Sequence, residues 1–269
     1  MSRFPLAVAA AALLTASAAS AQDGDGPRFC PNRPSLGSSP CTVEPGRVLV
    51  EASALDWQRD DSADSREDRI LAADLLARIG VGPNTEVHVG WTAFGHDRER
   101  DKASGGINRT NGIGDVTLAV RQHLLGPQSG EGFSLAVQPY VTLPAGRYPV
   151  GAGTLAAGAL IPIQYDLGKV ALQFTGEVDA AANGSGSGRH LAYSGIWGVA
   201  YKLTNSVTVN GEVSLERDRD PDGHETHALA ALSAAWQPSK KTQLDVLAVA
   251  GLNRTSPDVR LVFGGAVLF

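Results

Sequence analysis

The chain ends with Asp258-Val-Arg-Leu-Val-Phe-Gly-Gly-Ala-Val-Leu-Phe269. Counted back in twos, one register is wholly apolar and holds Phe269, Val267, Gly265, Phe263, Leu261 and Val259. The other register carries small and apolar residues together with both charges, Arg260 and Asp258. Because side chains alternate across the two faces of a strand, the first register suits lipid and the second suits a lumen. The segment therefore predicts a strand of an outer-membrane β-barrel.

The same alternation recurs along the chain and predicts twelve antiparallel strands. The expected strands are residues 47–58, 68–79, 85–97, 112–125, 132–144, 153–166, 169–181, 189–202, 207–218, 224–237, 242–253 and 258–269. One misread hairpin would change the count to ten or fourteen. Short turns alternate with longer polar connections such as 98–111, as periplasmic turns alternate with outer loops in membrane barrels. An even count would place both ends of the barrel in the periplasm.

A soluble β-sandwich also alternates, so alternation alone does not identify a membrane barrel. The aromatic residues separate the two architectures. Those that fall on the apolar face beside an expected short turn are Phe133, Tyr165, Tyr201, Trp236 and Phe269. A ring of aromatics at one end of the strands is typical of a membrane interface. The sequence thus predicts an all-β, transmembrane antiparallel β-barrel over residues 46–269.

The front of the chain predicts export. Residues 1–21 hold one positive residue, Arg3, then an apolar run and the small-residue ending Ala19-Ser20-Ala21. This pattern indicates a signal peptide cleaved after Ala21, whereas a membrane anchor would need a longer apolar run. No later stretch of about 18 apolar residues exists, which excludes a helical membrane protein. The net charge of -5 argues against a nucleic-acid partner. We expect the chain in the outer membrane of a Gram-negative bacterium.

Residues 22–45 show little hydrophobic periodicity and either hang in the periplasm or fold into the lumen as a plug. They contain the only two cysteines, Cys30 and Cys41. In an oxidising periplasm a disulfide is the natural interpretation. A metal pair is the alternative, but two cysteines without nearby histidines or further cysteines do not make a zinc site.

Charged residues in the middle of the strands fall on the face expected to line the lumen, where acids outnumber bases. The pore-lining candidates are Arg78, Glu86, His88, Arg121, His123, Glu177, Glu212 and Asp245. Symmetric turns would place Arg78 opposite Glu86, Glu86 opposite His123, and His88 opposite Arg121. This belt is either structural charge pairing or a pore constriction. The lumen is either a path that favours cations and neutral solutes or an interior filled by side chains.

No residue pattern predicts catalysis, a cofactor or a metal. His224 and His227 are three apart on an expected strand, so their rings point to opposite faces. A lipid-modifying enzyme of the outer membrane would need a Ser–His pair facing lipid, whereas the strand-borne histidines fall on the lumen face. No Gly-x-Ser-x-Gly motif is present.

Several motifs carry a resemblance to a known family. They are Asn32-Arg-Pro-Ser35, Pro45-Gly46 before Val48–Glu51, Gly112-Ile-Gly-Asp-Val-Thr-Leu118, Pro139-Tyr-Val-Thr-Leu-Pro-Ala-Gly146 and the final Phe269. Over roughly the whole mature chain, the sequence resembles the outer-membrane proteins grouped as the putative MetA-pathway of phenol degradation family. The resemblance implies a barrel that moves small compounds, aromatic or hydrophobic ones among them.

The residues and the resemblance together predict an outer-membrane channel for the passive passage of small solutes. The alternatives are a lipid-modifying enzyme and a sealed structural barrel. The expected partners are outer-membrane lipid, lipopolysaccharide and a small-molecule solute. A C-terminal aromatic such as Phe269 also resembles the ending by which barrels engage their assembly machinery.

Overall fold

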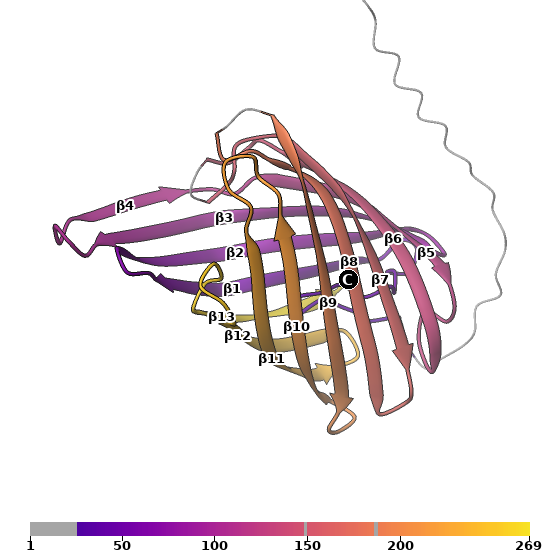
Figure 1. Ribbon diagram of the computed structural model, residues 1–269. Coiled ribbons are helices and arrows are strands. Elements are labelled where there is room, and N and C mark those ends of the chain that lie inside the picture. The colour runs from indigo at the N-terminus through magenta and orange to yellow at the C-terminus, as the bar shows by residue number, and fades with distance from the viewer. Residues whose placement is uncertain (1–25, 148–149, 186–187) are drawn as a thin grey trace, which may run out of the picture.

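The computed structural model describes residues 26–147, 150–185 and 188–269, and every regular element in these ranges is a β-strand (Figure 1). The predicted signal peptide, residues 1–21, lies outside the described residues. The strands are β1 (Val48–Asp61), β2 (Ser65–Gly82), β3 (Thr85–Asp101), β4 (Ile107–Gly112), β5 (Val116–Leu125), β6 (Gly132–Leu143), β7 (Ala156–Asp166), β8 (Val170–Ala182), β9 (Arg189–Lys202), β10 (Val207–Asp218), β11 (Thr226–Ser239), β12 (Thr242–Gly251) and β13 (Val259–Leu268).

The strands close into one antiparallel barrel. Apart from β4 and β5, neighbours in sequence are neighbours in the sheet, and β1 closes the ring by pairing with β13 from Leu49 opposite Leu268 onward. Both β4 and β5 pair with β3, at different heights, so together they fill one position in the wall. The barrel therefore has twelve strand positions and one extra strand, which confirms the predicted fold class.

The predicted facing is confirmed on β13, whereas β1, β2 and β3 depart from regular alternation near mid-length. On β13, Phe263 and Val267 are exposed on the outside, whereas Val262 and Ala266 are buried inside. The five aromatics expected at one rim are all exposed. Four of them lie near strand ends that adjoin the short turns, and Phe269 directly follows β13. A barrel in lipid keeps its apolar band on the outside in this way.

The predicted 98–111 loop and the single strand 112–125 are wrong. Residues 95–100 instead pair with 107–112 in a hairpin that continues β3 to Asp101, and β5 begins only at Val116. The alternating charges of 98–102 look like a solvated loop in the sequence, yet they suit a strand whose two faces are both wet. Residues 113–115 interrupt the regular strand between the end of β4 and the start of β5.

The predicted cross-strand partners of the belt are each displaced by two residues. Arg78 lies opposite His88, Glu86 lies opposite Arg121, and His88 lies opposite Ala119. The first displacement arises because the turn after β2 is tighter than assumed and a bulge follows at Gly80. The second arises because the hairpin between β3 and β4 turns earlier than a symmetric loop would. A shift of two keeps the face, so all of these side chains still point inward.

Irregular backbone in β1, β2 and β3 exchanges the two faces of the sheet near mid-length. Ser53 and Asp56 are both buried inside although they are three residues apart, and a bulge lies between them. Their partners Asp74 and Leu71 are also three apart, around Ala73 with its positive φ of 52°. Beyond this point the outer ends of four strands extend past the rest of the barrel (Figure 1). We call residues 57–61, 65–70, 96–101 and 107–111 the wing.

Candidate functional site: a disulfide-closed segment in the lumen

Residues 26–43 run along the inside of the barrel and are here called the inner segment. The disulfide between Cys30 and Cys41 closes its central loop. Phe29 and Val43 pack with Leu49 and Leu268, on the inner face of the seam between β1 and β13. The loop lies between two groups of inward-facing side chains, one on β2, β3 and β5 and one on β8, β10 and β12.

The first group is a cluster of buried charges around Glu86. Its carboxylate accepts hydrogen bonds from Arg78 Nε at 3.0 Å and from the backbone N–H of Val43 at 2.6 Å. It also lies 2.6 Å from His88 Nε2 and 3.3 Å from Arg121 Nη1. Both arginines donate to the backbone carbonyl of Cys41, at 2.9 and 3.2 Å. The same charged side chains therefore pair with one another across the barrel wall and hydrogen-bond to the inner segment.

Glu51 and Asp245 hold the Asn32-Arg33 dipeptide. The Glu51 carboxylate accepts the backbone N–H groups of Asn32 and Arg33 at 3.1 and 3.0 Å, and Arg78 at 3.1 Å. The Arg33 side chain crosses the lumen to Asp245, with Nη2 2.8 Å from Oδ1. It passes over Gly264, where a Cβ atom would lie 2.4 Å from the guanidinium. The same Cβ atom would lie 2.1 Å from the backbone carbonyl oxygen of Ala52, and this close backbone explains the glycine on the inner face of β13.

The tip of the inner segment reaches the far wall. Glu212 accepts hydrogen bonds from Ser35 Oγ at 2.5 Å and from the Leu36 N–H at 3.0 Å. Thr175 Oγ1 accepts the N–H of Ser38 at 2.9 Å. Gly37 lies so close to Thr175 that an added Cβ would be 2.8 Å from its hydroxyl. The loop thus spans the barrel from β2 to β8 and β10.

The inner segment gathers most of the predicted pore-lining residues. Arg78, Glu86, Arg121, His123, Glu212 and Asp245 hydrogen-bond to it, and His88 contacts it through Glu86. Glu177 stands apart and accepts the Tyr140 hydroxyl at 2.7 Å. Sequence reasoning missed Arg33 and Asn32 as contact residues. The signal in the sequence is the Asn32-Arg-Pro-Ser35 motif, which by itself carries only the family resemblance.

Three cavities border the inner segment; two have a mixed polar and apolar lining, and the third is lined mainly by apolar residues such as Leu36, Leu160 and Ile196. The first, of about 300 Å³, lies towards the short turns and is lined by Asp166, Gln173 and Gln237 among others. The second and third, of about 280 and 290 Å³, adjoin the opposite side, near Asp115 and Glu177 respectively. The interior is therefore only partly filled by side chains and by the inner segment.

The comparisons with known proteins agree with this architecture. Residues 31–268 match the protein family described as "Putative MetA-pathway of phenol degradation". The chain belongs to this family. A comparison with curated proteins gave no match.

Among solved structures, the chain is similar to the COG4313 outer membrane channel from Pseudomonas putida F1. The two are 14% identical with a TM-score of 0.69, over 93% of this chain and 100% of that one. The NanC porin is 11% identical with a TM-score of 0.50, over 80% of this chain and 99% of that one. Likeness at this identity establishes the fold. The family, the fold and the apolar outer band place the protein in the outer membrane of a Gram-negative bacterium.

Within the described ranges, no three His, Cys, Asp or Glu side chains are grouped so that they could hold a metal ion. No helix of the described chain is long and apolar enough to cross a membrane.

Proposed function

We propose that the protein is a passive channel for small solutes and that the inner segment is its plug. The observation that carries the proposal is the set of cavities on both sides of the inner segment, two of them with a mixed polar and apolar lining. A barrel with a purely structural role could fill its interior with side chains, as barrels of about eight strands do. Twelve strands enclose more space, and here part of that space stays open on either side of one short loop.

The charges near the cavities favour cations and neutral solutes. The second cavity is bordered by Glu51, Asp74 and Asp115 against a single base, Arg33. Glu177 borders the third. Carboxylates at a constriction repel anions and attract cations. The family description adds small aromatic compounds as the class of solute to be tested first.

In this proposal the termini and the short turns face the periplasm, and the wing faces outward. The aromatic rim then marks the inner interface of the membrane. The hairpin at 98–111 cannot gate the lumen as a flexible loop would, because its residues are paired in the wing. Gating is assigned to the plug alone.

The proposal assigns no catalytic role. The histidines closest to the inner segment, His88 and His123, are buried inside the barrel. His88 contacts Glu86, and His123 contacts the backbone carbonyls of Pro40 and Gly126. A lipid-hydrolysing centre would need its nucleophile and base on the side that faces lipid.

Planar-bilayer recording tests the proposal. The double variant Ser35→Ala/Glu212→Gln removes the hold on the tip and is expected to raise the single-channel conductance several-fold. Ser214→Ala is the matched control, because Ser214 is on the same inner face of β10 and makes no hydrogen bond to the described inner segment. A chain that lacks residues 26–43 should conduct still more. If wild type and both plug variants fail to conduct, the barrel is sealed and the proposal is wrong.

A further inference from the structure

The outward face of the wing is basic. Because the two faces of a strand alternate, the paired register gathers one set of side chains on this face. Its charged members are Arg59, Arg66, Arg98, Arg100 and Arg109, against Asp61 and Asp68. The inward face has the opposite sign, with Asp60, Glu67, Asp97, Glu99 and Asp101 against Arg69. A strand hairpin that needed only to be soluble would mix the two signs on each face.

The arginines of the outward face lie directly opposite one another. Arg66 is the cross-strand partner of Arg100, and Arg98 is the partner of Arg109. Like charges in these positions destabilise a sheet unless an anion lies between them. The outward face of the wing therefore places arginine opposite arginine twice, once between β2 and β3 and once between β3 and β4, and a bound anion would relieve both pairs.

The carboxylates on this face do not neutralise the arginines. Asp68 is shared by three of them, at 2.8 Å from Arg59, 3.2 Å from Arg66 and 4.0 Å from Arg98. Arg100 and Arg109 are exposed, and neither forms an ion pair with another described residue. Asp61 is engaged by Lys102 at 2.5 Å. The outermost part of the face therefore keeps an uncompensated positive charge.

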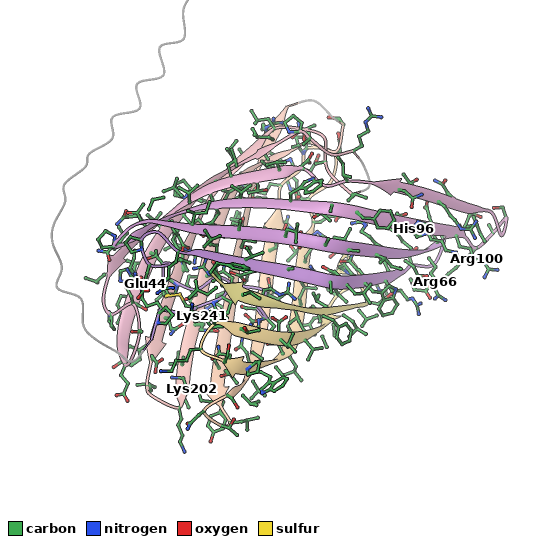
Figure 2. The ribbon with its side chains drawn as sticks, turned by 180° about the vertical axis from the view of Figure 1, so that it is seen from behind. Glu44, Arg66, His96, Arg100, Lys202 and Lys241 are labelled. Atoms are coloured by element: carbon green, nitrogen blue, oxygen red, sulfur yellow. A yellow bond between two sulfur atoms is a disulfide. The ribbon has the colours of Figure 1, made fainter. Side chains whose placement is uncertain are left out.

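The basic face continues the lipid-facing surface of the barrel. Leu55, Trp57 and Ile70 lie below it on the same outward side, and Phe94 is 47% exposed there. The Arg59 guanidinium lies 4.8 Å from the centre of the Trp57 ring. Tryptophan concentrates at the level of lipid headgroups, so the arginines stand at or just beyond that level. Figure 2 shows Arg66, His96 and Arg100 at this end, far from Glu44, Lys202 and Lys241.

We propose that the outward face of the wing binds the phosphate groups of phosphorylated glycolipids in the outer leaflet. Guanidinium groups match phosphate oxygens with paired hydrogen bonds, and a basic cluster at a membrane surface recruits anionic lipid. The bound phosphates would lie between the like-charged pairs. The inference rests on the outward orientation of the wing in the proposed function.

The test is the binding of lipid A, a glycolipid with two phosphates, to the purified full chain in detergent micelles, measured by native mass spectrometry. Each basic residue near an anionic surface changes affinity roughly five-fold, so Arg100→Gln/Arg109→Gln is expected to weaken binding about 25-fold. The control Arg219→Gln/Arg254→Gln removes the same charge from exposed positions in other loops. It is expected to change the affinity less than two-fold.

Two further arms identify the ligand chemistry. Lipid A without its phosphates should bind wild type as weakly as intact lipid A binds the double variant. Inorganic phosphate in tenfold excess should not displace intact lipid A. The proposal is overturned if the two double variants lose the same affinity for lipid A. It is also overturned if dephosphorylated lipid A binds wild type as tightly as intact lipid A, or if inorganic phosphate displaces intact lipid A. Wild-type conductance, recorded separately, decides the channel function: a conducting protein without lipid binding refutes only the lipid site.

Discussion

Replacing Glu86 by glutamine should strip the charge cluster of its central anion. The carboxylate is fully buried and neutralises Arg78 and Arg121, both of which are also fully buried. Without it, Glu51 is the one carboxylate left within ion-pair distance of Arg78, and Arg121 has none among the described residues. Breaking a buried ion pair by removing one partner costs about 3–5 kcal/mol, because an uncompensated charge stays buried. We expect Glu86→Gln to lower the free energy of unfolding by that amount.

The assay is equilibrium unfolding in guanidinium chloride from phospholipid vesicles, followed by tryptophan fluorescence. Glu177→Gln is the matched control, because Glu177 accepts the Tyr140 hydroxyl and forms no ion pair with a base in the described part of the chain. Its loss should cost about 1 kcal/mol. Adding Arg121→Gln to Glu86→Gln should recover part of the stability, since the double variant buries one less unpaired charge. Equal losses in Glu86→Gln and Glu177→Gln would mean that water screens the cluster, and the reasoning would be refuted.

Three other predictions follow from the same structure. Cys30→Ser/Cys41→Ser should lower the free energy of unfolding by about 3 kcal/mol, because the cross-link no longer restrains the unfolded chain. Added reductant should then have no further effect on the variant. An unchanged midpoint of denaturant unfolding would contradict this prediction. Val213→Arg, on the lipid face at mid-strand, should lower the free energy of unfolding by about 2–4 kcal/mol, whereas Val207→Arg near the rim should lower it by no more than about 1 kcal/mol. Equal losses of stability in the two variants would place the membrane elsewhere. The pKa of Asp60, in the wing, is raised by partial burial and by the nearby carboxylates of Asp258, Glu67 and Asp61. A raised pKa means that Asp60 takes up its proton at a higher pH than ordinary aspartates, whose pKa is about 3.9. Cation selectivity should therefore begin to fall, as the pH is lowered, while those aspartates are still ionised. Asp60→Asn should remove this step, and identical selectivity–pH profiles for wild type and variant would exclude the effect.

Much of the fold could be predicted from the sequence because one physical constraint acts on every strand. Lipid on one side and a polar interior on the other require strict alternation, and β13 shows it as clearly in the structure as in its letters. The rim aromatics give the ends of the strands in the same way. Neither feature depends on which residues pair across the sheet.

Register depends on turn geometry, and there the sequence was a poor guide. The displacement of Glu86 from His123 to Arg121 follows from where the β3–β4 hairpin turns, which composition does not specify. The face exchange near Ala73 is also invisible in the letters, because alanine gives no warning of a positive φ. The charge cluster was still predicted as a group, since an error of two residues leaves every side chain on its face.

The contacts of the inner segment lay beyond prediction for a different reason. Polar residues 31–39 have no periodicity and match no local template, because their partners are scattered around the barrel wall. Arg33 and Asp245 are 212 residues apart. Only the closed structure brings these residues together.

That separation bears on the order of assembly. The inner segment precedes β1, yet its partners include Asp245 on β12, and the strand it leads into is completed by β13. Its binding site therefore does not exist until nearly the whole chain has been made and the sheet has curled round. Contacts this distant in sequence form late and slowly. The first described residues of the chain are thus among the last to reach their final positions, and the lumen is filled only as the barrel closes.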